Sequence, residues 1–156
     1  MKAVLQVALL HRVRSSRGIE LIRHRHAVAS AALDSLRDKA APSLIESHIS
    51  LEEGNFFHVD LSCSTIIYVN SLALANETLL RLAEKLSNEL PRGALVATLK
   101  ALESPGLAHE SSVYLQMTFG SVPTRVLLYI RTGRSRATLL RKLKARALCS
   151  LGRAPA

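Results

Sequence analysis

The run of β-branched and apolar residues at positions 65–69, Thr-Ile-Ile-Tyr-Val, constrains the fold more than any other segment. Its residues are suited to a strand covered on both faces, as in a parallel sheet. Leucines at helical spacing follow over residues 79–86, and a second apolar run occupies residues 94–99. A strand, a helix and a strand in this order predict a crossover unit whose two strands lie side by side and parallel.

The flanking sequence repeats this alternation and then changes character. Before residue 65 the pattern predicts two more helices and two more strands, and near the C-terminus it predicts a hairpin. The expected helices are 3–13 and 24–39, the strands 18–21 and 47–50, and the hairpin strands 113–119 and 125–131. The sequence therefore predicts an α/β fold, a mostly parallel sheet with a C-terminal antiparallel hairpin.

The basic residues are concentrated at the C-terminus. Residues 1–130 carry 13 Lys and Arg against 12 Asp and Glu, whereas residues 131–156 carry eight bases and no acid, within a net charge of +9. We therefore separate a domain over 1–132 from a basic amphipathic helix or tail over 133–156. Such a tail favours polyanions such as DNA or RNA, and a membrane-surface helix or a charged disordered end are the alternatives.

The start of the chain departs from the usual order of a nucleotide-binding sheet. Such sheets open with a strand and a glycine-rich turn, and an acidic residue that binds ribose follows about 20 residues later. This chain opens on a helical pattern, and Glu20 lies at that distance from Met1. We expect the first strand and the glycine loop to be missing, which would leave the strands at Ile19 and Ile67 with unpaired edges.

Several other classes of site are not indicated. No apolar run approaches the roughly 18–20 residues that cross a bilayer, so no membrane partner is expected. Cys63 and Cys149 have no CxxC spacing, and the six histidines show no metal-ligand pattern apart from His24 and His26, which a helix would point apart. We therefore predict no metal.

Four blocks of sequence resemble the disruptor-of-telomeric-silencing family of histone lysine methyltransferases. They are Val4-Leu5-Gln6-Val7-Ala8, Gly18-Ile19-Glu20, Gly54-Asn55-Phe56 and Tyr68-Val69-Asn70-Ser71. The resemblance extends over residues 1–132 and implies the Rossmann-like class I methyltransferase fold. It also implies S-adenosyl-L-methionine as cofactor, a lysine of histone H-three in the nucleosome core as substrate, and a nuclear location.

The same resemblance assigns residues to the cofactor. It implies that Glu20 holds the ribose, that Phe56 packs on the adenine, and that Asn55 occupies the position of an Asp that binds the adenine amino group. Lys2 corresponds to the residue after the last glycine of the missing loop. Asn70 would lie beside the methionine part of the cofactor and take part in catalysis.

Substrate contacts are implied at two further places. Ser71, Leu74, Phe119 and Leu128 would line the substrate channel. The basic tail would contact DNA through Arg134, Arg136, Arg141, Lys142, Lys144 and Arg146. Two alternatives stay open: a non-enzymatic nucleic-acid-binding module on a degenerate methyltransferase fold, and an RNA methyltransferase of the same fold. The sequence does not indicate the oligomeric state.

Overall fold

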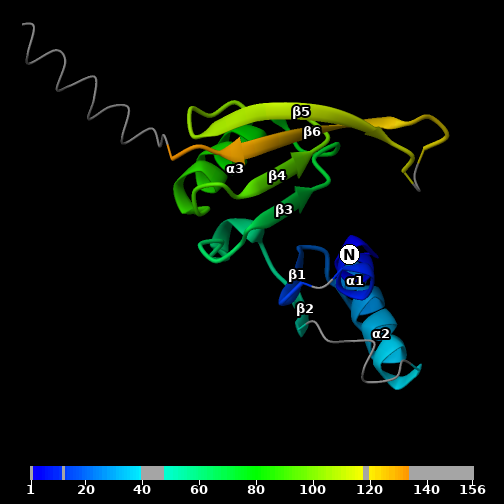
Figure 1. Ribbon diagram of the computed structural model, residues 1–156. Helices are drawn as coiled ribbons and strands as arrows, with labels where there is room; N and C mark the ends of the chain where they lie inside the picture. The colour runs from blue at the N-terminus through cyan, green and yellow to red at the C-terminus, as the bar shows by residue number, and fades with distance from the viewer. Residues whose placement is uncertain (1, 12, 40–47, 118–119, 134–156) are drawn as a thin grey trace, which may run out of the picture. The chain divides into compact units, whose positions relative to one another are not determined.

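The computed structural model describes residues 2–11, 13–39, 48–117 and 120–133, and the chain divides into two compact units between Val59 and Asp60. Each unit contains a pair of parallel strands joined through a helix (Figure 1). The α/β class predicted from the sequence is confirmed. No helix among these residues is long and apolar enough to span a bilayer.

The first unit begins with α1 (Lys2–Leu10) and β1 (Ser15–Glu20), followed by α2 (Arg23–Lys39), β2 (His48–Glu53) and the short 3-10 helix η2 (Phe56–His58). Strands β1 and β2 pair in parallel, from Ser15 opposite His48 to Glu20 opposite Glu53. Helix α2 supplies the crossover that a parallel pair requires. The strands therefore end together at one edge.

A small apolar core holds this unit together. Ala8, Leu33 and Ile49 are buried, and each comes from a different element: α1, α2 and β2. The hydroxyl of Ser16 donates a hydrogen bond of 2.9 Å to the carbonyl of Val4, which fastens α1 to β1. The core thus explains why an apolar stripe recurs on both helices.

The second unit contains β3 (Ile66–Val69), α3 (Asn76–Glu89), β4 (Leu95–Thr98), β5 (Leu107–Leu115) and β6 (Thr124–Arg131). Its four strands lie in the order β3-β4-β6-β5 (Figure 1). β3 and β4 are parallel, whereas β6 is antiparallel to both β4 and β5. The predicted crossover unit and the predicted hairpin are both present.

Helix α3 and the sheet form the core of the second unit. Leu82 and Leu86 on α3 and Val96 on β4 are at most 1% exposed. The Nε of Arg131 on β6 donates to the carbonyl of Ser87 on α3 at 3.1 Å, which fixes the helix to the sheet. Gly93 ends the turn after α3 with φ of 84°, a conformation that favours glycine.

Strand β1 begins three residues before its predicted start at 18 and β2 ends three residues after its predicted end at 50, and two further strands differ in ways that have a physical reason. β5 begins at Leu107, six residues before the predicted start at 113, because an edge strand tolerates the exposed polar residues that precede Val113. β3 was expected to be covered on both faces, yet Ile66 is 67% exposed and Tyr68 45% exposed. β3 is an edge strand of its sheet, so its environment is less buried than its composition suggests.

Two strands have an open edge in the part of the chain that the structure describes. Among the described residues β1 pairs only with β2, and β3 pairs only with β4. Each strand therefore has one side without a hydrogen-bonded neighbour strand in that part of the chain. The predicted helix in the basic tail lies outside the described residues.

Candidate cofactor and substrate site

The first group of candidate residues lies at the carboxyl edge of β1 and β2. Glu20 ends β1 directly opposite Glu53, which ends β2. The Gly54 amide then donates to the Glu20 carbonyl at 2.9 Å, so the chain after β2 crosses beside Glu20. The structure thereby brings Glu20 and the Gly54-Asn55-Phe56 turn together. This edge is where parallel α/β sheets bind their ligands.

The carboxylate of Glu20 is half-buried and only partly engaged. Its Oε1 accepts a 3.1 Å hydrogen bond from the Ile22 amide, which orients the group in the turn after β1. Among the described residues the Oε2 atom has no such partner. A carboxylate in this state has lone pairs left to accept hydrogen bonds from hydroxyl groups.

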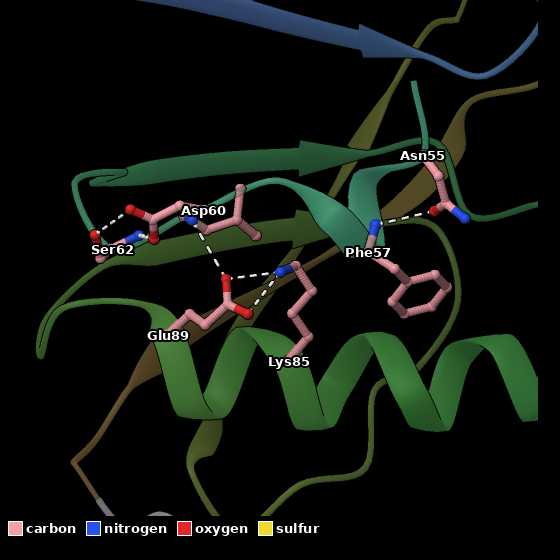
Figure 2. Close-up of polar contacts among 7 residues, drawn as sticks. Asn55, Phe57, Asp60, Ser62, Lys85 and Glu89 are labelled. Atoms are coloured by element: carbon pink, nitrogen blue, oxygen red, sulfur yellow. Dashed lines mark hydrogen bonds and ion pairs between the residues drawn. The ribbon is translucent and has the colours of Figure 1, made fainter. Parts of the chain in front are cut away.

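The turn after β2 presents an amide and two aromatic rings. The Asn55 Oδ1 accepts a 3.0 Å hydrogen bond from the Phe57 amide and caps η2, as Figure 2 shows. This bond leaves the Asn55 Nδ2 and one lone pair of the Oδ1 for a ligand. The half-buried rings of Phe56 and Phe57 lie 4.4 Å apart between centroids, tilted by 37°. Together they form an aromatic surface beside a hydrogen-bond donor.

The second group of candidate residues lies at the carboxyl edge of β3 and β4. Asn70 follows the last residue of β3 and is exposed. Ser71 is fully buried, and its Oγ accepts hydrogen bonds from the amides of Leu99 at 3.0 Å and Lys100 at 2.8 Å. The hydroxyl therefore joins the ends of the two parallel strands and holds the backbone next to Asn70.

The remaining candidates are placed as follows. Lys2 begins α1 and is exposed, and Leu74 is half-buried in the segment between β3 and α3. Leu128 is half-buried within β6 opposite Ala97, which is inside the sheet and not at its carboxyl edge. Phe119 and the tail residues Arg134, Arg136, Arg141, Lys142, Lys144 and Arg146 lie outside the described residues. The roles assigned to these side chains stay predictions.

Sequence reasoning overlooked two residues of these edges. Phe57 pairs with Phe56, a role that the Phe-Phe doublet after a turn could have indicated. Lys100 follows β4, and its Nζ donates to the Leu74 carbonyl at 2.8 Å across the same edge as Asn70. The only sequence signal for Lys100 is its position just after a buried strand.

Two groups on the strands that lead to these edges have shifted pKa values. A hydrogen bond from Arg17 lowers the pKa of the Glu52 carboxylate on β2 below 4.5. Partial burial raises the pKa of the Tyr68 hydroxyl, two residues before Asn70. Within the described ranges no three His, Cys, Asp or Glu side chains gather as metal ligands would.

Comparison with solved structures identifies the fold. An RNA methyltransferase from Salinibacter ruber, crystallised with S-adenosyl-L-homocysteine, matches with a TM-score of 0.65 and 17% identity, covering 85% of this chain and 75% of that one. A protein of Haemophilus influenzae provisionally described as a methylase matches with a TM-score of 0.53 and 12% identity, over 78% of this chain and 74% of that one. A provisional methyltransferase from Escherichia coli matches with a TM-score of 0.52 and 13% identity, over 78% and 66%. The chain has the class I methyltransferase fold.

In sequence comparisons, no protein-family model and no curated protein matches the chain. The resemblance to the disruptor-of-telomeric-silencing family is wrong, because the structural neighbours are bacterial RNA and provisional methyltransferases. Three of the four blocks that suggested it lie at strand ends, and Gly18-Ile19-Glu20 is where nucleotide-binding sheets of this type place an acidic residue, whereas the block at residues 4–8 lies in α1. They therefore indicate the fold without indicating the substrate. The nuclear location and the DNA contact inferred with that family are not tested by these comparisons.

Proposed function

We propose that this chain is an S-adenosyl-L-methionine-dependent methyltransferase that acts on RNA. The observation that carries the proposal is the likeness to the Salinibacter ruber RNA methyltransferase over 85% of this chain. The candidate residues support it, because each group lies at the carboxyl edge of a parallel strand pair. That edge is the usual ligand side of such sheets.

The residues of the first unit fit the nucleoside part of the cofactor. The available oxygen of Glu20 would accept hydrogen bonds from the ribose hydroxyls. The Phe56 and Phe57 rings would pack on the adenine, and the Asn55 Nδ2 would donate to a ring nitrogen. The Asn55 Oδ1, which caps η2 with one lone pair, keeps a second lone pair for the predicted contact with the adenine amino group.

Asn70 would position the atom of RNA that is methylated. When bound, S-adenosylmethionine would supply a methyl group that is activated by a positively charged sulfonium. The leaving group for methyl transfer would be a neutral thioether. The exposed amide of Asn70 can donate to and accept from an attacking nitrogen without adding a charge. Ser71 and Lys100 would affect methyl transfer indirectly, because the hydrogen bond between them holds the backbone next to Asn70 in place.

The experiment is methyl transfer from tritiated S-adenosylmethionine to a pool of RNA, with nucleosomes and free protein as parallel substrates. Label should enter RNA. Glu20→Gln should raise the KM for the cofactor roughly 10- to 100-fold, because a charge-assisted hydrogen bond is lost. Asn70→Ala should lower kcat on the order of 10²-fold, since orientation of the nucleophile is lost.

Two matched variants control for general damage. Glu53→Gln changes the carboxylate opposite Glu20 in the strand pair, and Asn88→Ala changes an exposed amide on α3. Both should stay within about twofold of the wild type. RNA binding without transfer would instead favour the non-enzymatic nucleic-acid-binding module, and label that enters protein alone would overturn RNA as the substrate.

A further inference from the structure

The hairpin formed by β5 and β6 carries an exposed aromatic ring beside an exposed guanidinium. Tyr114 is 70% exposed and lies directly opposite Arg125 in the antiparallel pair, so both side chains project from the same face. Ser112 lies on that face two residues earlier, and its Oγ accepts a 3.1 Å hydrogen bond from the Arg125 Nη2. Among the described residues no carboxylate pairs with Arg125.

The pairing of the strands places this face beside the edge that carries Asn70. Thr98, the last residue of β4, is opposite Leu127. Arg125 precedes Leu127 by two residues, and because β6 is antiparallel to β4 it lies beyond the carboxyl end of β4. Tyr114 and Arg125 therefore project past the carboxyl end of β4, and Figure 1 shows the hairpin running on beyond the ends of β3 and β4. β5 is three strand spacings from β3, about 14 Å. A short strand of nucleic acid could span that distance.

We infer that Tyr114 and Arg125 form a contact surface for single-stranded RNA, the ring stacking on a base and the guanidinium binding a phosphate. An exposed aromatic next to an unpaired Arg is the combination that single-stranded nucleic acids recognise. The hydrogen bond from Arg125 to Ser112 limits the motion of the guanidinium and so reduces the entropy lost on binding. The inference rests on RNA being the substrate of the proposed reaction, and it adds where the substrate is held.

The test measures binding of a fluorescein-labelled 12-nucleotide single-stranded RNA to the full chain by anisotropy, over a range of salt concentrations. Tyr114→Ala should weaken binding roughly 5- to 150-fold without changing the salt dependence, because stacking is lost. Tyr114→Phe should bind within about twofold of the wild type. Arg125→Ala should weaken binding and reduce the slope of log affinity against log salt by about 0.7, as expected for one phosphate contact.

Val122→Ala is the matched control, because Val122 is also 70% exposed and carries no ring or charge. Circular dichroism verifies that each variant is folded. If the wild type methylates RNA while Tyr114→Ala and Arg125→Ala bind RNA normally, the inference fails and the proposed function stands. If the variants lose RNA binding but the wild type transfers no methyl group, the surface is supported and the proposed function fails. A wild type that binds only a protein partner overturns both.

Discussion

The hydroxyl of Ser71 accepts a hydrogen bond from the amide of Lys100 at 2.8 Å, and a second one from the amide of Leu99 at 3.0 Å. One buried oxygen on the residue that follows Asn70 thus accepts from two backbone amides just after β4, and so ties the ends of β3 and β4 together. It also explains why a small polar residue follows Asn70 in a fully buried position.

Removal of this oxygen should destabilise the second unit. Ser71→Ala leaves the buried Leu99 amide and the partly buried Lys100 amide without their acceptor, and we expect the free energy of unfolding to fall by about 1–3 kcal/mol. Urea denaturation followed by circular dichroism measures the change. Ser121→Ala, at an exposed position, should change stability by less than about 0.5 kcal/mol. Equal stability of the two variants would contradict the role given to Ser71.

A second buried hydroxyl can be tested in the same way. Tyr129 is 5% exposed, and its Oη accepts a 3.0 Å hydrogen bond from the Leu102 amide. Tyr129→Phe keeps the ring and removes the acceptor, so unfolding should become easier by about 1–3 kcal/mol. Tyr114→Phe makes the same chemical change on an exposed ring and should be neutral. A neutral result for both would mean that the Leu102 amide gains another acceptor.

The ion pair on α3 predicts an asymmetry between its two partners. The Lys85 side chain is 9% exposed, and its Nζ lies 2.6 Å and 2.7 Å from the two carboxylate oxygens of Glu89. Glu89 also accepts from the Leu61 amide at 3.3 Å, and Figure 2 shows these contacts. Glu89→Gln leaves a nearly buried ammonium without its counterion and should cost about 1–3 kcal/mol.

Lys85→Met is the matched test of the other partner. It keeps an apolar stem in the buried position and leaves Glu89, which is 34% exposed, in contact with water and with Leu61. We therefore expect a smaller loss of stability than for Glu89→Gln, measured by urea denaturation. If Lys85→Met is the more damaging change, the burial of the ammonium is not the dominant cost.

The pair between Arg17 and Glu52 predicts a pH dependence in the first unit. The Arg17 Nε lies 2.6 Å from the Glu52 Oε1, and this hydrogen bond lowers the pKa of Glu52 below its ordinary value of 4.5. The stabilisation is therefore present above pH 4.5 and disappears as the pH falls through the lowered pKa. Because both side chains are about 40% exposed, with values of 42% and 41%, the pair contributes only about 0.2–1 kcal/mol.

Two measurements test this pH dependence. An NMR titration should place the midpoint of Glu52 below its ordinary pKa of 4.5. Glu52→Gln should remove part of the loss of stability on acidification, because the titrating carboxylate is then absent. A Glu52 midpoint at or above 4.5 would show that Arg17 does not hold the carboxylate in solution.

The sequence was sufficient to predict the order of most elements, because the apolar periods at residues 65–69, 79–86 and 94–99 are strong and local. It placed Glu20 within a strand and placed Asn55 and Asn70 after strands, and the structure has Glu20 as the last residue of β1 and the two asparagines beyond β2 and β3. It misjudged β5, since polar residues such as His109 and Glu110 hide an edge strand whose stability comes from its partner. The cross-strand pairing of Tyr114 with Arg125 depends on register, which no local pattern specifies.

The sequence motifs could not predict the substrate class, and the reason is a different one. Glu20 and Asn70 are positions that a nucleoside-binding sheet needs at its strand ends, whatever molecule receives the methyl group. Their chemistry is shared by many enzymes of one fold. The residues that we propose to contact RNA lie on the β5–β6 hairpin, and the sequence alone does not give their pairing.

The edge of β3 that carries no partner strand in the described chain should be visible in hydrogen exchange. In a parallel ladder a strand alternates its amides between its two sides. The Leu95 amide donates to the Thr65 carbonyl at 2.9 Å, which sets the phase of the β3–β4 ladder. The amides of Ile67 and Val69 therefore point toward β4, and those of Ile66 and Tyr68 point away from it. The alternation of slow and fast exchange along these four residues would report directly whether another strand has joined the sheet.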